Sequence, residues 1–134
     1  MEKYKILIVD DDPDERLIFT DYFTAVCEDF DMEFVSNGML ALSHLESITE
    51  NWSLPQLIVL DLNMPVLNGV ETLKRLKSND RFKSIPVIIF SNADDDRERK
   101  MCAMLGADSF FLKPSTLDEA EKIGMHFFEA IEKK

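Results

Sequence analysis

The sequence has few of the features that mark exported, membrane-bound or disulfide-stabilised proteins. It contains only two cysteines, Cys27 and Cys102, which form no CxxC pair, and we expect both to be free thiols in apolar helical stretches. No apolar run reaches the roughly 20 residues that a membrane-spanning helix needs. The first apolar run, residues 6–9, is too short and too soon followed by aspartates for a signal peptide. These absences predict a cytoplasmic protein with no membrane segment.

Positive charge is scarce as well. The 15 Lys and Arg residues are outnumbered by 26 Asp and Glu residues, so the formal net charge is −11. No local basic patch interrupts the acidic excess, and such a charge repels the phosphate backbone of nucleic acids. We therefore expect no direct binding to nucleic acid. The length of 134 residues suits one compact domain, and we expect residues 1–134 to form it without an output domain.

Short apolar runs alternate with helical patterns along the whole chain. Five runs are typical of buried strands, and they cover residues 4–9, 32–35, 57–60, 87–90 and 109–112. After the first run, apolar residues follow the spacing of one helix face: Phe19, Phe23, Val26 and Phe30. Five strands that alternate with five helices predict a doubly wound α/β fold, with a parallel sheet covered on both faces.

The acidic run after the first strand has two parts. Asp12 suits the N-cap of the first helix, because Pro13 follows at the first helical position and Glu15 completes a capping-box pattern. This capping role accounts for Asp12 fully. We therefore leave Asp12 out of any functional site and keep Asp10 and Asp11.

Polar residues follow four of the predicted strands. Asp10 and Asp11 end the first strand, Asp61 the third, Ser91 the fourth and Lys113 the fifth. In sheets of this kind the ligand crevice lies at the carboxyl ends of the strands. We therefore expect these side chains to share one rim of the molecule.

Three carboxylates at one rim need a compensating cation. At an effective dielectric constant near 20, two carboxylates about 5 Å apart repel each other by roughly 3 kcal/mol. Oxygen ligands without cysteine or histidine favour Mg²⁺, and we expect His44 and His126 to lie on helices away from the rim. The sequence therefore predicts a Mg²⁺ site built from Asp10, Asp11 and Asp61.

The same residues fit phosphoryl chemistry. Asp61 could attack an activated phosphoryl group while Mg²⁺ and the Lys113 ammonium neutralise the transferring oxygens, and Ser91 could donate a hydrogen bond to the product. Each residue also has an ordinary structural explanation. An acidic residue after a strand often caps a helix, a serine often starts a turn, and a lysine is usually solvated.

The combined set resembles the receiver domain of two-component response regulators, in the right order and over essentially the whole chain. It consists of Asp10-Asp11, Asp61-Leu62-Asn63-Met64-Pro65, Asn68-Gly69, Ser91 and Lys113-Pro114. The resemblance implies a flavodoxin-like (βα)5 fold with strand order 2-1-3-4-5. It also implies a phosphorelay in which a sensor histidine kinase, or a histidine phosphotransfer protein, donates a phosphoryl group from phosphohistidine.

Site roles follow from the resemblance residue by residue. Asp61 matches the phosphoacceptor, Asp11 a direct metal ligand, and Asp10 a carboxylate that acts mainly through water. Asn63 matches a position that binds the metal through its backbone carbonyl. Lys113 matches the lysine that pairs with the phosphoryl group.

The remaining matches concern the response to phosphorylation. Ser91 matches the hydroxyl residue that binds the phosphoryl group, and Lys113-Pro114 suggests a cis peptide bond as in the family. Phe110 matches the aromatic switch position, although a buried strand aromatic explains it equally well. Phe110 lacks the tyrosine hydroxyl common in the family, and Asn92 replaces the usual small residue, so the sharpness of the switch and the phosphoryl lifetime stay open.

Signal output would use the face made by the fourth helix, fifth strand and fifth helix. Helical spacing places four residues outside the inner stripes there: Met101, Met104, Met125 and Phe128. Exposed methionines suit adaptable contacts, which predicts a downstream protein partner or a homodimer. The alternative is that these residues complete the core or lie singly on the surface.

Two rival functions remain. A haloacid-dehalogenase-type phosphohydrolase also places an aspartate at a strand end, but it needs a second carboxylate two residues later, where this chain has Asn63. A non-switching scaffold would often lose an acid, the acceptor or the lysine, and all are present here. We therefore expect a regulatory phosphoacceptor that assists its own phosphorylation and dephosphorylation, rather than an enzyme.

Overall fold

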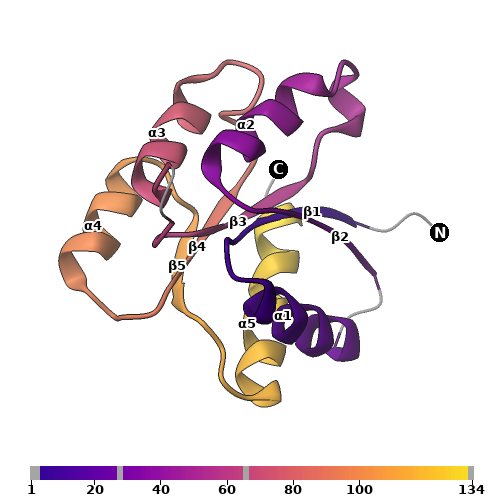
Figure 1. The fold of residues 1–134 in the computed structure, drawn as a ribbon, viewed down its shortest axis with the longest axis vertical. Coiled ribbons are helices and arrows are strands. Elements are labelled where there is room, and N and C mark those ends of the chain that lie inside the picture. The colour runs from indigo at the N-terminus through magenta and orange to yellow at the C-terminus, as the bar shows by residue number, and fades with distance from the viewer. Residues whose placement is uncertain (1–3, 27–28, 65–66, 133–134) are drawn as a thin grey trace.

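Five parallel strands form the centre of the structure (Figure 1). The structure is a computed structural model, and it describes residues 4–26, 29–64 and 67–132. The strands are β1 (Tyr4–Val9), β2 (Phe30–Val35), β3 (Leu57–Asp61), β4 (Val87–Ser91) and β5 (Ser109–Leu112). They pair in the order β2-β1-β3-β4-β5, and every pairing is parallel. The predicted doubly wound fold and its strand order are confirmed.

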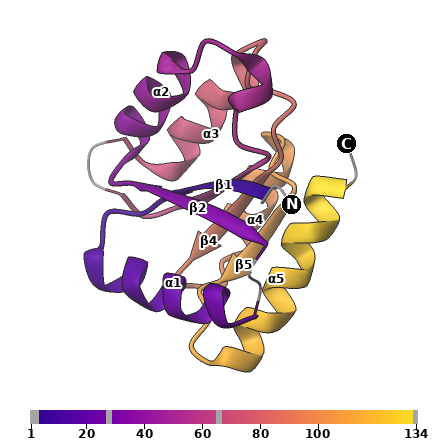
Figure 2. The same ribbon diagram turned by 90° about the vertical axis from the view of Figure 1, so that its right-hand side faces the viewer.

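Helices cover both faces of this sheet (Figure 2). Those in the described part of the chain are α1 (Pro13–Val26), α2 (Gly38–Ser47), α3 (Gly69–Ser78), α4 (Asp96–Met104) and α5 (Leu117–Glu132), with a short 3-10 turn at Asn51–Ser53. Alternate residues of a strand point to opposite faces. Leu7 and Val9 of β1 therefore join the core under α2, α3 and α4, whereas Ile6 and Ile8 join the core under α1 and α5.

Polar caps define where α1 and α5 begin. The Asp14 N–H donates to the Asp12 carboxylate at 2.9 Å, which confirms Asp12 as the cap of α1. At α5 the Glu119 N–H donates to the Thr116 hydroxyl at 3.1 Å, so Thr116 is the cap. The prediction that Glu15 completes a capping box at α1 is wrong, however, because its side chain contacts Lys113 instead.

Three other details differ from the sequence-based expectations or lie outside what the structure describes. Phe30 does not continue the α1 stripe but begins β2, where its ring packs 5.7 Å from that of Phe127. No peptide bond between described residues is cis, so the bond before Pro114 has the trans form that X–Pro bonds ordinarily favour. Cys102 is a buried free thiol as expected, whereas Cys27 lies outside the described residues.

Within residues 4–26, 29–64 and 67–132, no helix has both the length and the apolar composition that crossing a bilayer requires.

Candidate functional site

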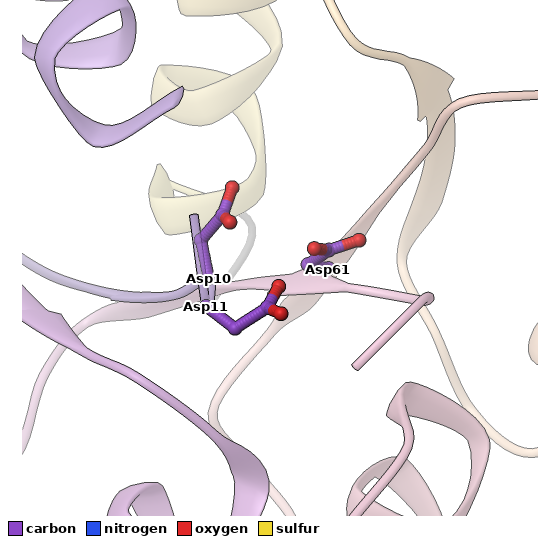
Figure 3. Close-up of side chains that lie close together, drawn as sticks. All are labelled: Asp10, Asp11 and Asp61. Carbon is purple, nitrogen blue, oxygen red and sulfur yellow. The ribbon is translucent and has the colours of Figure 1, made fainter. Parts of the chain in front are cut away.

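Three aspartates converge at the carboxyl ends of β1 and β3 (Figure 3). Asp10 and Asp11 follow β1, and Asp61 is the last residue of β3, which lies beside β1 in the sheet. One carboxylate oxygen from each lies within 4.8 Å of the others. Asp10 and Asp61 are buried, with exposed fractions of 5% and 3%, whereas Asp11 is exposed. The predicted acidic cluster is therefore real.

Lys113 brings the balancing positive charge. It follows β5, and its backbone N–H donates to the Ser91 carbonyl at 3.0 Å, which fixes where its side chain starts. Its ammonium lies 3.3 Å from the Asp61 carboxylate and 3.8 Å from that of Asp10. The ammonium also contacts the carboxylate of Glu15, from α1. One ammonium thus meets three carboxylates.

Glu15 is the residue that sequence reasoning missed at this site. It is the third residue of α1, a position where glutamate is also typical of a capping box. One sequence signal points to Glu15: the first turn of α1 follows closely after the end of β1. A glutamate in that turn is long enough for its carboxylate to reach back to the rim of the sheet.

Burial dominates the electrostatics of the two buried aspartates. It raises the pKa of Asp10 to about 7, with Glu15 and Asp61 adding to the effect and the Asp12 N–H and Lys113 opposing it. It also raises the pKa of Asp61, against the Asn63 N–H and Lys113. Without a cation, the folded protein therefore holds these carboxyl groups at a cost in stability.

The carboxylates in turn affect Lys113. Burial alone lowers the pKa of the Lys113 ammonium, but Glu15, Asp61 and Asp10 outweigh this effect, so that the pKa is raised. Lys113 therefore stays charged at neutral pH.

Asp11 and Asn63 face solvent together. The Asn63 N–H donates to the Asp61 carboxylate at 3.0 Å, which holds the chain after β3 close to Asp61. Asp11 and Asn63 line one open cleft of about 540 Å³, together with Glu98 of α4. A separate cavity of about 180 Å³ is lined by Glu15 and Lys113, among others.

Ser91 lies at the rim but is turned into its own loop. Its side chain is buried, and its hydroxyl donates to the Ala93 carbonyl at 3.0 Å and accepts from the Ala93 N–H at 3.2 Å. The structure therefore places Ser91 on the strand next to that of Asp61, with its hydroxyl bound to Ala93. Binding a phosphoryl group would require its hydroxyl to leave Ala93.

Phe110 is turned inward. Its exposed fraction is 7%, and the guanidinium of Arg99 lies 4.7 Å from the centre of its ring. Arg99 also donates to the Phe110 carbonyl at 3.1 Å and to the Asp94 carboxylate at 2.6 Å. Arg99 thus connects the loop after β4 with β5.

The expected output face is partly as predicted. Met101, Met104 and Met125 are exposed, Met104 to 88%. The prediction that Phe128 belongs to this exposed face is wrong. The centre of its ring lies 5.6 Å from that of Tyr4 and 4.8 Å from that of Phe30, at the edge of the core. The helical spacing did not reveal this, because β1 and β2 supply the covering rings.

Comparison with known proteins identifies the family. Residues 6–123 match the response regulator receiver domain, and the chain belongs to this family of two-component signalling proteins. Receiver domains bind Mg²⁺ through acidic residues and interact with histidine kinases and downstream effectors.

The two histidines lie on helices, as expected. His44 of α2 pairs with Glu33, and His126 of α5 pairs with Glu129.

Individual relatives show how far the likeness extends. The transcriptional regulatory protein CpxR homolog of Haemophilus influenzae is 34% identical over 82% of this chain, which spans 44% of that protein. The chain thus covers about half or less of the first curated relatives. Among solved structures, the phosphorylated cyanobacterial phytochrome response regulator RcpA is 27% identical, with a TM-score of 0.80 and 95% and 92% of the two chains covered. The Mn²⁺-bound response regulator Rcp1 is 25% identical, with a TM-score of 0.77 and coverage of 92% and 91%.

Proposed function

We propose that this receiver domain is a phosphorylation switch whose acceptor is Asp61. The observation that carries the proposal is the Lys113 ammonium 3.3 Å from the Asp61 carboxylate, within the acidic cluster at the carboxyl ends of the strands. A carboxylate oxygen of Asp61 attacks the phosphorus of a phosphohistidine. The P–N bond breaks, an acyl phosphate forms, and the imidazole leaves and regains a proton.

The donor set fits a hard divalent cation, and we propose Mg²⁺. Asp11 and Asp61 would bind it through carboxylate oxygens, Asn63 through its backbone carbonyl and Asp10 mainly through water. When bound, Mg²⁺ supplies positive charge that offsets the carboxylates and the oxygens of the transferring group. The likeness to the Mn²⁺-bound Rcp1 supports a divalent cation at this place.

Lys113 and Ser91 would complete the phosphoryl-binding groups. The ammonium of Lys113 already lies next to Asp61 and would pair with a phosphoryl oxygen. The Ser91 hydroxyl would exchange the Ala93 carbonyl for another phosphoryl oxygen, which moves the loop after β4. Because Arg99 binds both Asp94 of that loop and Phe110, this movement would reach β5 and make Phe110 the switch residue.

Phosphoryl uptake should depend on the metal. After incubation with acetyl phosphate and Mg²⁺, intact-mass measurement is expected to show a gain of one phosphoryl group, and an excess of EDTA should prevent it. Asp11→Asn should raise the Mg²⁺ concentration needed for half-maximal uptake at least about tenfold, because it removes a direct ligand.

Asp12→Asn is the matched control, since it removes a neighbouring charge but keeps a good helix cap. It should leave the Mg²⁺ requirement unchanged. Uptake that persists in EDTA would contradict the metal site. A wild-type protein that takes up no phosphoryl group would favour the scaffold alternative, and steady release of inorganic phosphate would favour the phosphohydrolase.

We propose that the signal leaves through the face of α4, β5 and α5. Met101, Met104 and Met125 expose flexible apolar side chains there, which suits a protein partner or a second copy of the chain. Beryllofluoride with Mg²⁺ mimics phosphoaspartate, and it is expected to raise the sedimentation coefficient if the chain dimerises through this face. Met104→Lys should then cancel the increase. A treated sample that sediments as the free protein does would rule out phosphorylation-driven dimerisation.

A further inference from the structure

The Glu15 carboxylate contacts the Lys113 ammonium, the group that would pair with the phosphoryl group in the proposed reaction. Lys113 contacts Glu15 more closely than it does Asp61 or Asp10, which lie 3.3 and 3.8 Å away. The side chains of Lys113 and Glu15 are only 16% and 30% exposed, so water screens this ion pair less than one at the open surface. The cap of α1 does not need Glu15, because Asp12 provides it.

We infer that Glu15 is a positioning residue for phosphorylation at Asp61, which holds the Lys113 ammonium in the free protein and competes with the phosphoryl group for it. This inference rests on the proposed function. It adds a regulatory step to that function, because the ammonium has to pass from the Glu15 carboxylate to a phosphoryl oxygen.

The competition follows from the chemistry of the two acceptors. A lysine ammonium has three N–H donors, and here three carboxylates already lie around it. A phosphoryl group brings up to two negative charges and three acceptor oxygens into the same space. The Glu15 charge opposes the arrival of these charges, whereas those of Asp11 and Asp61 are offset by the proposed Mg²⁺.

The surroundings of Glu15 give it room to move. Glu15 and Lys113 line the cavity of about 180 Å³, together with Ile18 and Asn92. Once released, the carboxylate can turn into this cavity without displacing the core. Asp10 lines the same cavity, but it is buried and its carboxylate accepts the Asp12 N–H at 2.9 Å, which holds it in place.

Glu15→Gln tests the competition directly. Glutamine keeps the size of the side chain and an oxygen that can accept from Lys113, but it removes the charge. At saturating Mg²⁺, the second-order rate constant for uptake from acetyl phosphate is expected to rise about three- to fivefold, the effect of one partly screened charge pair. The matched control is Asp14→Asn, which removes a charge from the exposed neighbour of Glu15 and should leave the rate constant unchanged.

A second readout follows Lys113 itself, without any phosphodonor. In ¹⁵N-lysine spectra, the Lys113 ammonium should give a slowly exchanging signal in the wild-type protein that broadens in Glu15→Gln. Glu15→Asp, which keeps the charge, should return the uptake rate toward the wild-type value. A merely structural role of Glu15 would not produce this dependence on charge.

Two results would overturn the inference. One is an uptake rate in Glu15→Gln equal to or below that of Asp14→Asn, and the other is a Lys113 signal that Glu15→Gln does not change. A wild-type protein without phosphoryl uptake would instead refute the proposed function, and the Lys113 spectra would still decide whether Glu15 holds the ammonium.

Discussion

Asp61→Asn is expected to abolish phosphoryl uptake and, in the same protein, to stabilise the metal-free fold. The first effect follows because an amide oxygen does not form a stable acyl phosphate. The second follows because Asp61 is 3% exposed and lies among other carboxylates, which burial makes costly to ionise. Removing one of these charges should raise the free energy of unfolding at neutral pH by on the order of 2 kcal/mol.

Urea unfolding with EDTA, followed by circular dichroism, measures this gain. Asparagine keeps an oxygen that can accept from the Asn63 N–H, so the loop after β3 should stay in place. Addition of Mg²⁺ should stabilise the wild-type protein more than Asp61→Asn, because the variant lacks a proposed ligand. An Asp61→Asn protein that is less stable than the wild type in EDTA would refute the account of the electrostatics.

Asp10 is expected to make the stability of the metal-free protein depend on pH. Its pKa is raised from 3.8 to about 7 in the folded protein. Between these values the folded chain holds a proton that the unfolded chain releases, so stability falls as pH rises through this window. The loss due to Asp10 should be on the order of 4 kcal/mol, since one pKa unit corresponds to about 1.4 kcal/mol.

The difference between wild type and Asp10→Asn isolates this effect from other titrating groups. In EDTA, the variant should gain stability relative to the wild type as pH rises from about 4 to about 7, and the gain should level off above that range. Asp12→Asn is the control, because Asp12 caps α1 and should show no comparable gain. A constant difference between Asp10→Asn and the wild type across this range would mean that Asp10 ionises as it does in the unfolded chain.

Much of the fold was predictable because its signals are local. Buried parallel strands appear as short apolar runs, and those at residues 4–9 and 109–112 were placed with the bounds that the structure has. The strand order came from the family resemblance, not from the runs themselves. The acidic cluster was predictable because the topology brings the carboxyl ends of β1 and β3 together, so that Asp11 and Asp61 had to meet.

The errors share a physical cause, which is that local patterns do not reveal distant partners. Glu15 fits a capping box, but its partner is Lys113, 98 residues later in the chain. Phe30 continues a helical spacing by coincidence after α1 has ended, and the same ring is equally suited to β2. Phe128 lies outside the inner stripe of α5, yet Tyr4 covers it from the first strand.

Locating the phosphoryl group tests the central proposal most directly. The protein is incubated with acetyl phosphate and Mg²⁺, and then treated with borohydride, which reduces an aspartyl phosphate to homoserine. Peptide sequencing by mass spectrometry is expected to find homoserine at position 61 and nowhere else, with none in a sample that received EDTA. Homoserine at Asp10 or Asp11, or phosphate on a serine with position 61 unchanged, would contradict the proposal.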